Sequence, residues 1–394
     1  MVQLVRSIMG LYCLTGDHMN IEVKKALENH PVSAQLLEEQ RARVTSAFNF
    51  SRKEHAAVET DIRWWIVEQW HDGTLEKELL RCDDAQKVLA TCIATGEKIP
   101  IDKPIPGVKR TETWSGVPVK YVNGGYPGSK RTITLETALG SLTASEEYAS
   151  RSFGITEYPV KNIDDLRIAR QVYEQIAKSV MDDEIYGCAP MTPIQILLIH
   201  LAGVENTVYL LMDHQQEVEE FLEFIEELFT PVIEALAKKN KVVFFVENYS
   251  SEVSGGYFEQ YIKPVLLRRR EIAKKNGAMI GVHHDGKLMP MVGWLKESGV
   301  GYINGITAAP SGDAPPEKIR ELVGEGVVIA DIYPQSIFMN EFKEEEFVEY
   351  IRRVAEFYKD DYGVIYGIGD MLPCVSDIRR YERMISIIEE VTRV

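Results

Sequence analysis

Two adjacent histidines and an aspartate form the part of this sequence best suited to chemistry. His283, His284 and Asp285 follow the apolar run at 278–282. Imidazole nitrogens and carboxylate oxygens bind divalent metals such as zinc. The segment lacks the ligand spacing of HExxH, so a loop hydrogen bond for one histidine and a helix cap at Asp285 remain the alternative.

Polar residues also follow other apolar runs. Glu247 follows the run at 242–246, and Asn304, Asp331 and Asp370 follow later runs. A carboxylate in such a position is a metal ligand, an acid or base, or the partner of an arginine. For Asp370 alone, a turn or helix role is equally open. Cys374 is better explained as a small buried apolar residue.

The elements that must position these groups alternate along the chain from about residue 183. Candidate strands are EIYGCAP, KVVFFVEN, AMIGVHH, GYINGIT, GVVIADI and YGVIYGIGD, with helices between them and a final helix at about 377–392. This alternation predicts a parallel sheet covered by helices, either open or closed into a barrel. In both cases the carboxyl ends of the strands lie together, where active sites form. Neither GxGxxG nor GxxxxGK[ST] occurs, which disfavours a nucleotide-binding sheet.

The N-terminal third has a different pattern. Residues 33–48 and 54–70 are helix-forming, and the second stretch ends in WWIVEQW. Trp64 and Trp65 would face different sides of a helix, so we expect at least one of them in the core. Residues from about 100 to 145 contain Pro, Gly and β-rich pieces, which predict one or two hairpins with NGG as a turn.

Composition excludes several classes of protein. The chain has 394 residues, 45% of them apolar, and its net charge is −16 from 44 basic and 60 acidic residues. It is therefore long and apolar enough for a full core, and too acidic for a nucleic-acid protein or a cationic membrane-surface module. Five widely spaced cysteines without a CxxC pair indicate a reducing compartment. No 18-residue apolar run and no signal cleavage site occur, so we expect a cytoplasmic protein.

Several long segments resemble the uroporphyrinogen decarboxylase superfamily, a group of (β/α)8 barrels that includes cobalamin-dependent methyltransferases. They are SFGITEYPVKNIDDLRIAR, PMTPIQILLIHLAGVENTVYLLMDHQQEVEEFLEFI, VENYSSEVSGGYFEQYIKPVLLRRREIAKKNGAMIGVHHDGKLMPMVGWLKESGVGYINGI and GIGDMLPCVSDIRRYERM. The resemblance runs from about residue 100 to the C-terminus and implies an α/β fold of the (β/α)8 TIM-barrel type. We therefore predict one structural domain, in which a helical extension at 1–100 packs on a barrel at 101–394 with an inserted hairpin at about 112–145.

Departures from the superfamily's motifs indicate the branch. The decarboxylases carry a Pro-x-Trp-x-Met-Arg-Gln-Ala-Gly-Arg segment that holds an acidic tetrapyrrole, and this chain has no match to it. The methyltransferases carry a zinc site with His-x-Cys-Gly at one strand end and a cysteine near the C-terminus. Here Asp285 and Asp370 replace both cysteines. The resemblance then implies a harder zinc site, similar to branches that cleave the methyl ethers of aromatic compounds.

The resemblance also implies roles for individual residues. We expect His283 and Glu247 to bind zinc with Asp285 or Asp370 as a third ligand, and we assign catalytic roles to His284 and Asp285. Four further residues are candidates for the substrate pocket by position, with ordinary packing as the alternative for the tyrosines: Tyr249, Tyr257, Asn304 and Tyr333.

The expected reaction is O-demethylation, in which the methyl group passes to cob(I)alamin on a separate corrinoid protein. Two alternatives remain. One is a decarboxylase or lyase of the same barrel type, whose basic pocket would come from Lys109, Arg110, Lys130 and Arg131. The other is a non-catalytic binding barrel. The final helix and the tryptophan-rich region are candidates for a homodimer interface.

Overall fold

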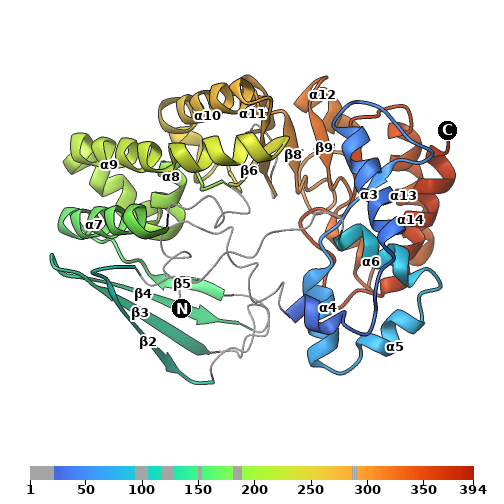
Figure 1. Cartoon of the computed structure of the whole chain (residues 1–394), viewed down its shortest axis with the longest axis horizontal. Coiled ribbons are helices and arrows are strands. Elements are labelled where there is room, and N and C mark those ends of the chain that lie inside the picture. The colour runs from blue at the N-terminus through green and yellow to red at the C-terminus, as the bar shows by residue number, and fades with distance from the viewer. Residues whose placement is uncertain are drawn as a thin grey trace. The chain divides into compact units, whose positions relative to one another are not determined.

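The chain folds into two compact units, which are described one at a time (Figure 1). The computed structural model describes residues 22–93, 105–117, 128–149, 153–180, 189–285, 287, 289 and 291–394. The described residues of the first unit lie within Lys98–Glu247 and Gly256–Ala278. The second unit combines Met19–Glu97 with Asn248–Gly255 and Met279–Val394, so it joins the two ends of the described chain.

The second unit contains a parallel sheet whose strands are ordered β1-β10-β9-β8-β7. These strands are β1 (Ala57–Val58), β7 (Met279–His283), β8 (Tyr302–Asn304), β9 (Val328–Ala330) and β10 (Val364–Tyr366). Its helices are α3 (Ala34–Ala47), α4 (Arg63–His71), α5 (Leu75–Leu80), α6 (Ala85–Ile93), α11 (Met291–Glu297), α12 (Ile319–Val323), α13 (Glu344–Tyr358) and α14 (Ile378–Thr392).

Burial on both faces explains why these strands appear as unbroken apolar runs. Every residue of β9 and β10 is buried, as expected for parallel strands that helices cover. Ile365 pairs with Ala57 on one side and with Ala330 on the other, and the three side chains form a core cluster. Asp377 caps α14 by accepting a hydrogen bond from the Arg379 amide, which confirms the predicted start of the final helix.

One strand of this sheet lies where the sequence predicts only a helix. The stretch 54–70 contains β1 before α4, and β1 pairs in parallel with β10. Two residues are too few to show an alternating pattern, so this strand depends on its distant partner. Trp64 and Trp65 are both buried, as expected for at least one of them. The structure therefore shows a mixed α/β fold with a parallel sheet, and closure into an eight-stranded barrel remains an expectation.

The first unit contains an antiparallel sheet in the order β2-β3-β4-β5. Its strands are β2 (Lys109–Ser115), β3 (Ser129–Glu136), β4 (Ser141–Tyr148) and β5 (Phe153–Glu157), so antiparallel strands occur where hairpins were predicted. The expected NGG turn and Cys188 lie outside the described residues. The unit also contains α7 (Ile163–Val180), α8 (Pro193–Ile196), α9 (Gly203–Lys239), β6 (Val242–Val246) and α10 (Lys263–Lys275). Short 3-10 or π segments occur in both units. Those of the first unit are Leu197–Leu201 and Phe258–Ile262, those of the second are Pro316–Lys318 and Gln335–Phe338, and Gly255–Tyr257 contains residues of both.

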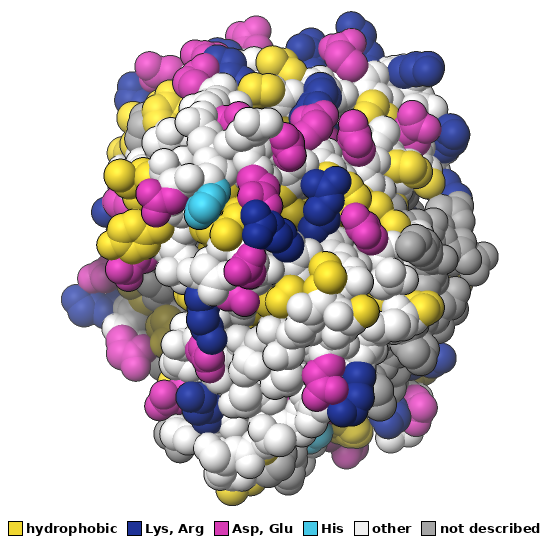
Figure 2. All heavy atoms as spheres, turned by 90° about the vertical axis from the view of Figure 1, so that its left-hand side faces the viewer, with side chains coloured by type: hydrophobic (Ala, Val, Ile, Leu, Met, Phe, Trp, Pro, Cys, Tyr) yellow, Lys and Arg dark blue, Asp and Glu magenta, His cyan; other side chains and the backbone are white. Residues whose placement is uncertain are grey.

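Charged side chains of both signs are mixed on the face that Figure 2 shows. Exposed ion pairs among the described residues include Arg167–Glu217 and Arg268–Glu223. The coloured part of this face shows no continuous basic patch of the kind that binds nucleic acid. Among the described residues, no helix has the length and apolar character needed to cross a bilayer.

Candidate metal centre

Three of the four predicted metal ligands come together in the second unit. His283, Asp285 and Asp370 each offer one ligand atom, and these atoms lie within 4.8 Å of one another. His283 is the last residue of β7, and Asp370 follows β10. The His283 Nε2 and Asp370 Oδ1 atoms are 3.8 Å apart. One imidazole and two carboxylates form a donor set that fits zinc or a similar divalent ion.

Hydrogen bonds hold the His283 ring at its Nδ1 atom, on the side away from Asp370. His283 Nδ1 lies 2.9 Å from Asn304 Oδ1, and Asn304 Nδ2 donates to Asp331 Oδ2 over 2.9 Å. Gly305 follows with a φ of +75°, and a Cβ at this position would lie 2.4 Å from His283 Cε1. The ring therefore lies against a backbone that has room only for glycine. Asn304, predicted as a pocket residue, contacts the metal centre through His283.

The surroundings of Asp370 disfavour the ionised form of its carboxyl group. Its Oδ2 accepts a hydrogen bond of 3.0 Å from Gln335 Nε2. Burial raises the pKa of Asp370 to about 6, and the nearby Asp285 and Asp61 carboxylates act in the same direction, while His283 opposes them. A bound cation would relieve this penalty, because it would compensate the negative charge of this half-buried carboxylate.

The backbone around Asp370 is fixed by the strands and by the segment after β1. The Gly369 amide donates to the Tyr333 carbonyl over 2.7 Å, and the Leu372 amide donates to the Asp61 carbonyl over 2.9 Å. Asp370 has a φ of +69°, in the left-handed region that aspartate tolerates better than most residues. Such a conformation persists only where neighbouring contacts enforce it.

Asp61 and Arg63 form a charged pair beside the centre that sequence reasoning missed. Arg63 Nη2 lies 2.6 Å from Asp61 Oδ2, and Arg63 Nε lies 2.9 Å from Oδ1. Burial alone would raise the pKa of Asp61, but Arg63 outweighs it, so that pKa is lowered. The signal was present in the sequence, because the run Ala56–Val58 is followed by Glu59-Thr60-Asp61, in the same way as other strand ends.

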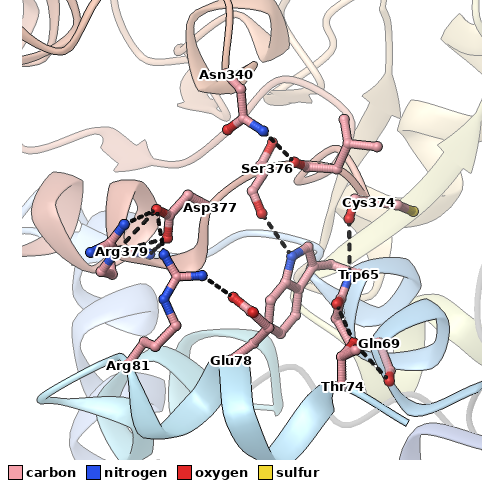
Figure 3. A network of polar contacts seen from close by, with 11 residues as sticks. Trp65, Gln69, Thr74, Glu78, Arg81, Asn340, Cys374, Ser376, Asp377 and Arg379 are labelled. Carbon is pink, nitrogen blue, oxygen red and sulfur yellow. Dashed lines mark hydrogen bonds and ion pairs between the residues drawn. The ribbon is translucent and has the colours of Figure 1, made fainter. Parts of the chain in front are cut away.

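A second set of contacts anchors the segment that follows Asp370 (Figure 3). The Trp65 indole donates to the Ser376 carbonyl over 3.0 Å, and Gln69 Nε2 donates to the Cys374 carbonyl over 3.1 Å. Asn340 Nδ2 donates to the Val375 carbonyl over 3.2 Å. Three consecutive carbonyls are thus held by side chains, which limits the movement of the loop that begins at Asp370.

His284 is fully buried beside this centre. Neither ring nitrogen has a hydrogen-bond partner among the described residues. Its ring lies near that of Tyr249, with 6.4 Å between the centroids. Burial lowers the pKa of His284 to about 4, with His283 adding to the effect. At neutral pH the ring is therefore uncharged, with one N–H donor and one acceptor nitrogen, and it carries no extra proton to deliver. Its catalytic role remains a prediction.

The three tyrosines expected near the substrate differ in their surroundings. Tyr249 is buried, whereas Tyr257 is half-buried in the first unit and lies near Tyr261. Tyr333 is fully buried, and its hydroxyl donates to the Ile351 carbonyl of α13 over 3.2 Å. The side chain of Tyr333 therefore corresponds to the packing alternative rather than to the pocket.

Glu247, the fourth predicted ligand, ends its run in the first unit and lies outside the three-residue group. Its buried carboxylate accepts hydrogen bonds from the Thr192 amide over 2.7 Å and from the Thr192 hydroxyl over 3.1 Å. Arg269 supports this arrangement, because it donates to the carbonyls of Pro190 and Met191 just before Thr192. A ligand role for Glu247 remains a prediction.

Comparison with known proteins identified no matching family model and no matching curated protein. Among solved structures, the chain is similar to a protein described as "methyltransferase from Methanosarcina mazei". The two are 11% identical with a TM-score of 0.49, and the match covers 89% of this chain and 98% of the other. A similarity this low decides nothing about function, which we take from the side chains described above.

Proposed function

We propose that this protein is a zinc-dependent methyltransferase that moves a methyl group from a methoxylated, most readily aromatic, substrate to the cob(I)alamin of a corrinoid protein. The single observation that carries the proposal is the grouping of His283, Asp285 and Asp370 within 4.8 Å. This is a hard donor set in which aspartates stand where a thiol-handling relative would have cysteines.

The donor set suits cleavage of an ether. In the proposed reaction the O–CH3 bond breaks and its electron pair stays on oxygen, while the methyl group takes two electrons from cob(I)alamin. Phenoxide is a poor leaving group, and the bound zinc would stabilise the negative charge that develops on it. The phenoxide then takes a proton from water. The residues His283, Asp285 and Asp370 would hold the ion, and Gln335 orients Asp370 through its hydrogen bond.

Other residues would complete the pocket. A neutral His284 would offer one hydrogen bond to the substrate, and the buried Tyr249 beside it would shape the wall. Asp285 combines a ligand role with the catalytic role predicted for it. Glu247 would be a further ligand. The corrinoid protein is the partner that the reaction requires.

Ion pairing weakens the alternative of a decarboxylase. Three of the four hairpin cations that would form a basic pocket have acidic partners in their own sheet. Lys109 lies 2.9 Å from Glu136, and Arg110 and Arg131 pair with Glu112 and Glu146. These pairs leave little unneutralised positive charge to attract a carboxylated substrate.

Metal content and methyl transfer together test the proposal. Purified protein should contain zinc, and methoxyaromatic compounds should convert the cob(I)alamin of a corrinoid carrier to methylcobalamin, which absorbance detects. His283→Ala should lose both properties, while His214→Ala, at an exposed site on α9, should keep them. Zinc binding without any methyl transfer would contradict the reaction and favour a binding barrel. Absence of zinc in a folded protein would contradict the metal centre itself.

A further inference from the structure

A chain of three side chains runs from the candidate metal centre into the core of the second unit. His283 contacts Asn304, and Asn304 contacts Asp331, each over 2.9 Å. Asp331 is 6% exposed and directly follows β9. Neither Asn304 nor Asp331 belongs to the group of ligand atoms. The chain therefore bears on how His283 is presented, rather than on which residues bind the ion.

The structure orients the Asn304 amide with its nitrogen toward Asp331 and its oxygen toward His283. The amide nitrogen only donates hydrogen bonds, and the amide oxygen only accepts them. Asp331 Oδ2 accepts from Nδ2, which leaves Oδ1 facing His283. Because Oδ1 has no hydrogen to give, the hydrogen between these atoms must come from His283 Nδ1.

Asp331 is enclosed so that it keeps this orientation. Its φ is +62°, and the backbone of Gly305 donates a hydrogen bond to its carboxyl group. A Cβ on Gly367 would lie 2.1 Å from Asp331 Oδ1 and 3.0 Å from the Thr60 hydroxyl, so the absence of a side chain there leaves just enough room. Oδ2 accepts from Asn304 when Asp331 is ionised, and equally when Asp331 carries a proton on Oδ1.

We propose that Asn304 and Asp331 are positioning residues that hold His283 as the tautomer protonated on Nδ1, so that Nε2 presents its lone pair to the metal. Nε2 is the atom that lies 3.8 Å from Asp370 Oδ1, on the ligand side of the ring. A histidine ligand usually donates its other N–H to a protein acceptor, which fixes ring and tautomer together. This inference rests on the proposed metal centre, but it does not depend on the methyl-transfer reaction.

The tautomer can be read directly in metal-free wild-type protein. Protein labelled with 15N-histidine is examined by long-range 15N–1H NMR over a range of pH, and the His283 signals are assigned by their loss in His283→Gln. We expect Nδ1 to show the shift of a protonated nitrogen and Nε2 that of an unprotonated nitrogen in the neutral ring. A proton on Nε2 would overturn the proposal, because it would mean that the Asn304 amide faces the other way.

Two variants at one position then separate tautomer control from packing. Asn304→Leu removes both hydrogen bonds at similar volume. Asn304→Asp keeps an acceptor for His283 Nδ1 and joins Asp331 through one shared proton, because two carboxylates in contact do not both ionise. Affinity is measured with Co2+ by its visible absorption, and then by competition with Zn2+. We expect the leucine variant to bind about 10–100-fold more weakly, and the aspartate variant to stay close to wild type.

Equal losses in the two variants, or no loss with leucine, would contradict the role. If the leucine variant does not fold, the wild-type NMR measurement still decides the question. A negative methyl-transfer assay would not change the NMR signals of His283 or the Co2+ affinities. The experiments therefore distinguish failure of this inference from failure of the proposed reaction.

Discussion

The candidate metal centre depends on residues whose backbone conformations few other residue types would adopt. Gly305, Asp331 and Asp370 all have a positive φ, and each comes at or shortly after the end of a parallel strand. Residues in this region of backbone space cost free energy unless the surroundings enforce them. Their grouping around His283 indicates that the fold gives up some stability to place these side chains.

Gly305→Ala should damage the centre more than it damages the fold. The new Cβ would meet the His283 ring at 2.4 Å and displace it, so we expect Co2+ affinity to fall at least tenfold. The matched control is Gly277→Ala, which has the same φ of +75° but no atom within 4 Å of the added Cβ. Both variants should lose about 1–2 kcal/mol of unfolding free energy from the left-handed conformation. Titration with Co2+ and urea denaturation measure the two effects. Similar affinity losses in both variants would contradict the contact with His283.

Asp370→Asn should stabilise the metal-free protein at neutral pH while weakening metal binding. In the unfolded chain Asp370 ionises near its ordinary pKa of 3.8, but in the folded chain its pKa is about 6. Between these values the folded state binds more protons than the unfolded state, so stability falls as pH rises through this window. Asparagine removes the buried charge, accepts the Gln335 hydrogen bond and tolerates the positive φ.

The gain in unfolding free energy should therefore appear in urea denaturation at pH 7.5 and nearly vanish at pH 3.5, where Asp370 is mostly protonated in both states. Asp213→Asn, at an exposed position on α9, serves as the control and should show no such difference. A gain of equal size at both pH values would contradict the electrostatic origin.

The grouping of His283, Asp285 and Asp370 was predictable at this scale, because it follows from local sequence patterns. His283, Asp285 and Asp370 follow apolar runs, and parallel strands bring such positions to one edge. The contacts of Asn304 and Asp61 were not predictable in this way. A hydrogen-bond partner depends on strand order and on side-chain rotamers, and neither is encoded in the spacing of one segment.

At the scale of elements, the N-terminal segment is part of the sheet that carries the centre. The Glu59 amide donates to the Tyr366 carbonyl, and the Thr60 hydroxyl accepts from the Ile368 amide. The sequence predicted the helix at 33–48, the final helix and the strands β7 to β10, because long periodic or apolar segments are recognisable without their partners. It did not predict β1, because two residues reveal no period and their role depends on pairing with β10, about 300 residues away.

Trp65→Phe tests whether α4 supports the loop after Asp370. The change removes the indole donor and leaves the Ser376 carbonyl without that partner, which costs about 1–3 kcal/mol beyond the lost packing. We also expect weaker Co2+ binding, because the loop from Asp370 to Ser376 loses one of its anchors. Trp64→Phe is the control, since Trp64 is buried next in sequence and has no side-chain hydrogen bond among the described residues. Equal Co2+ affinities in the two variants would show that the hydrogen bond from Trp65 to Ser376 does not affect metal binding.

At the scale of the whole molecule, the net negative charge acts at the surface, whereas the carboxylates of the interior depend on a cation beside them. The net charge of −16 favours cations near the surface over anions. In the first unit, Arg269 and Glu226 form a fully buried ion pair at 2.6 Å, and breaking such a pair strands a charge in the interior. In the second unit, the carboxylates of Asp285 and Asp370 lie together beside the His283 ring. A divalent cation would supply the compensation that Arg269 supplies in the first unit.

Zinc should therefore stabilise the folded protein as a whole. A ligand that binds the native state at 100 times its Kd adds about 2.7 kcal/mol to the unfolding free energy. We expect a shift of this size in urea denaturation when Zn2+ is added, and its loss with EDTA. Zinc also binds thiols in unfolded chains, which reduces the shift, so the comparison is made with His283→Ala, which keeps all five cysteines. His283→Ala should show no stabilisation, and His214→Ala should show the full effect. If His283→Ala retains the wild-type shift, zinc binds elsewhere, and the grouping of His283, Asp285 and Asp370 is not the metal centre.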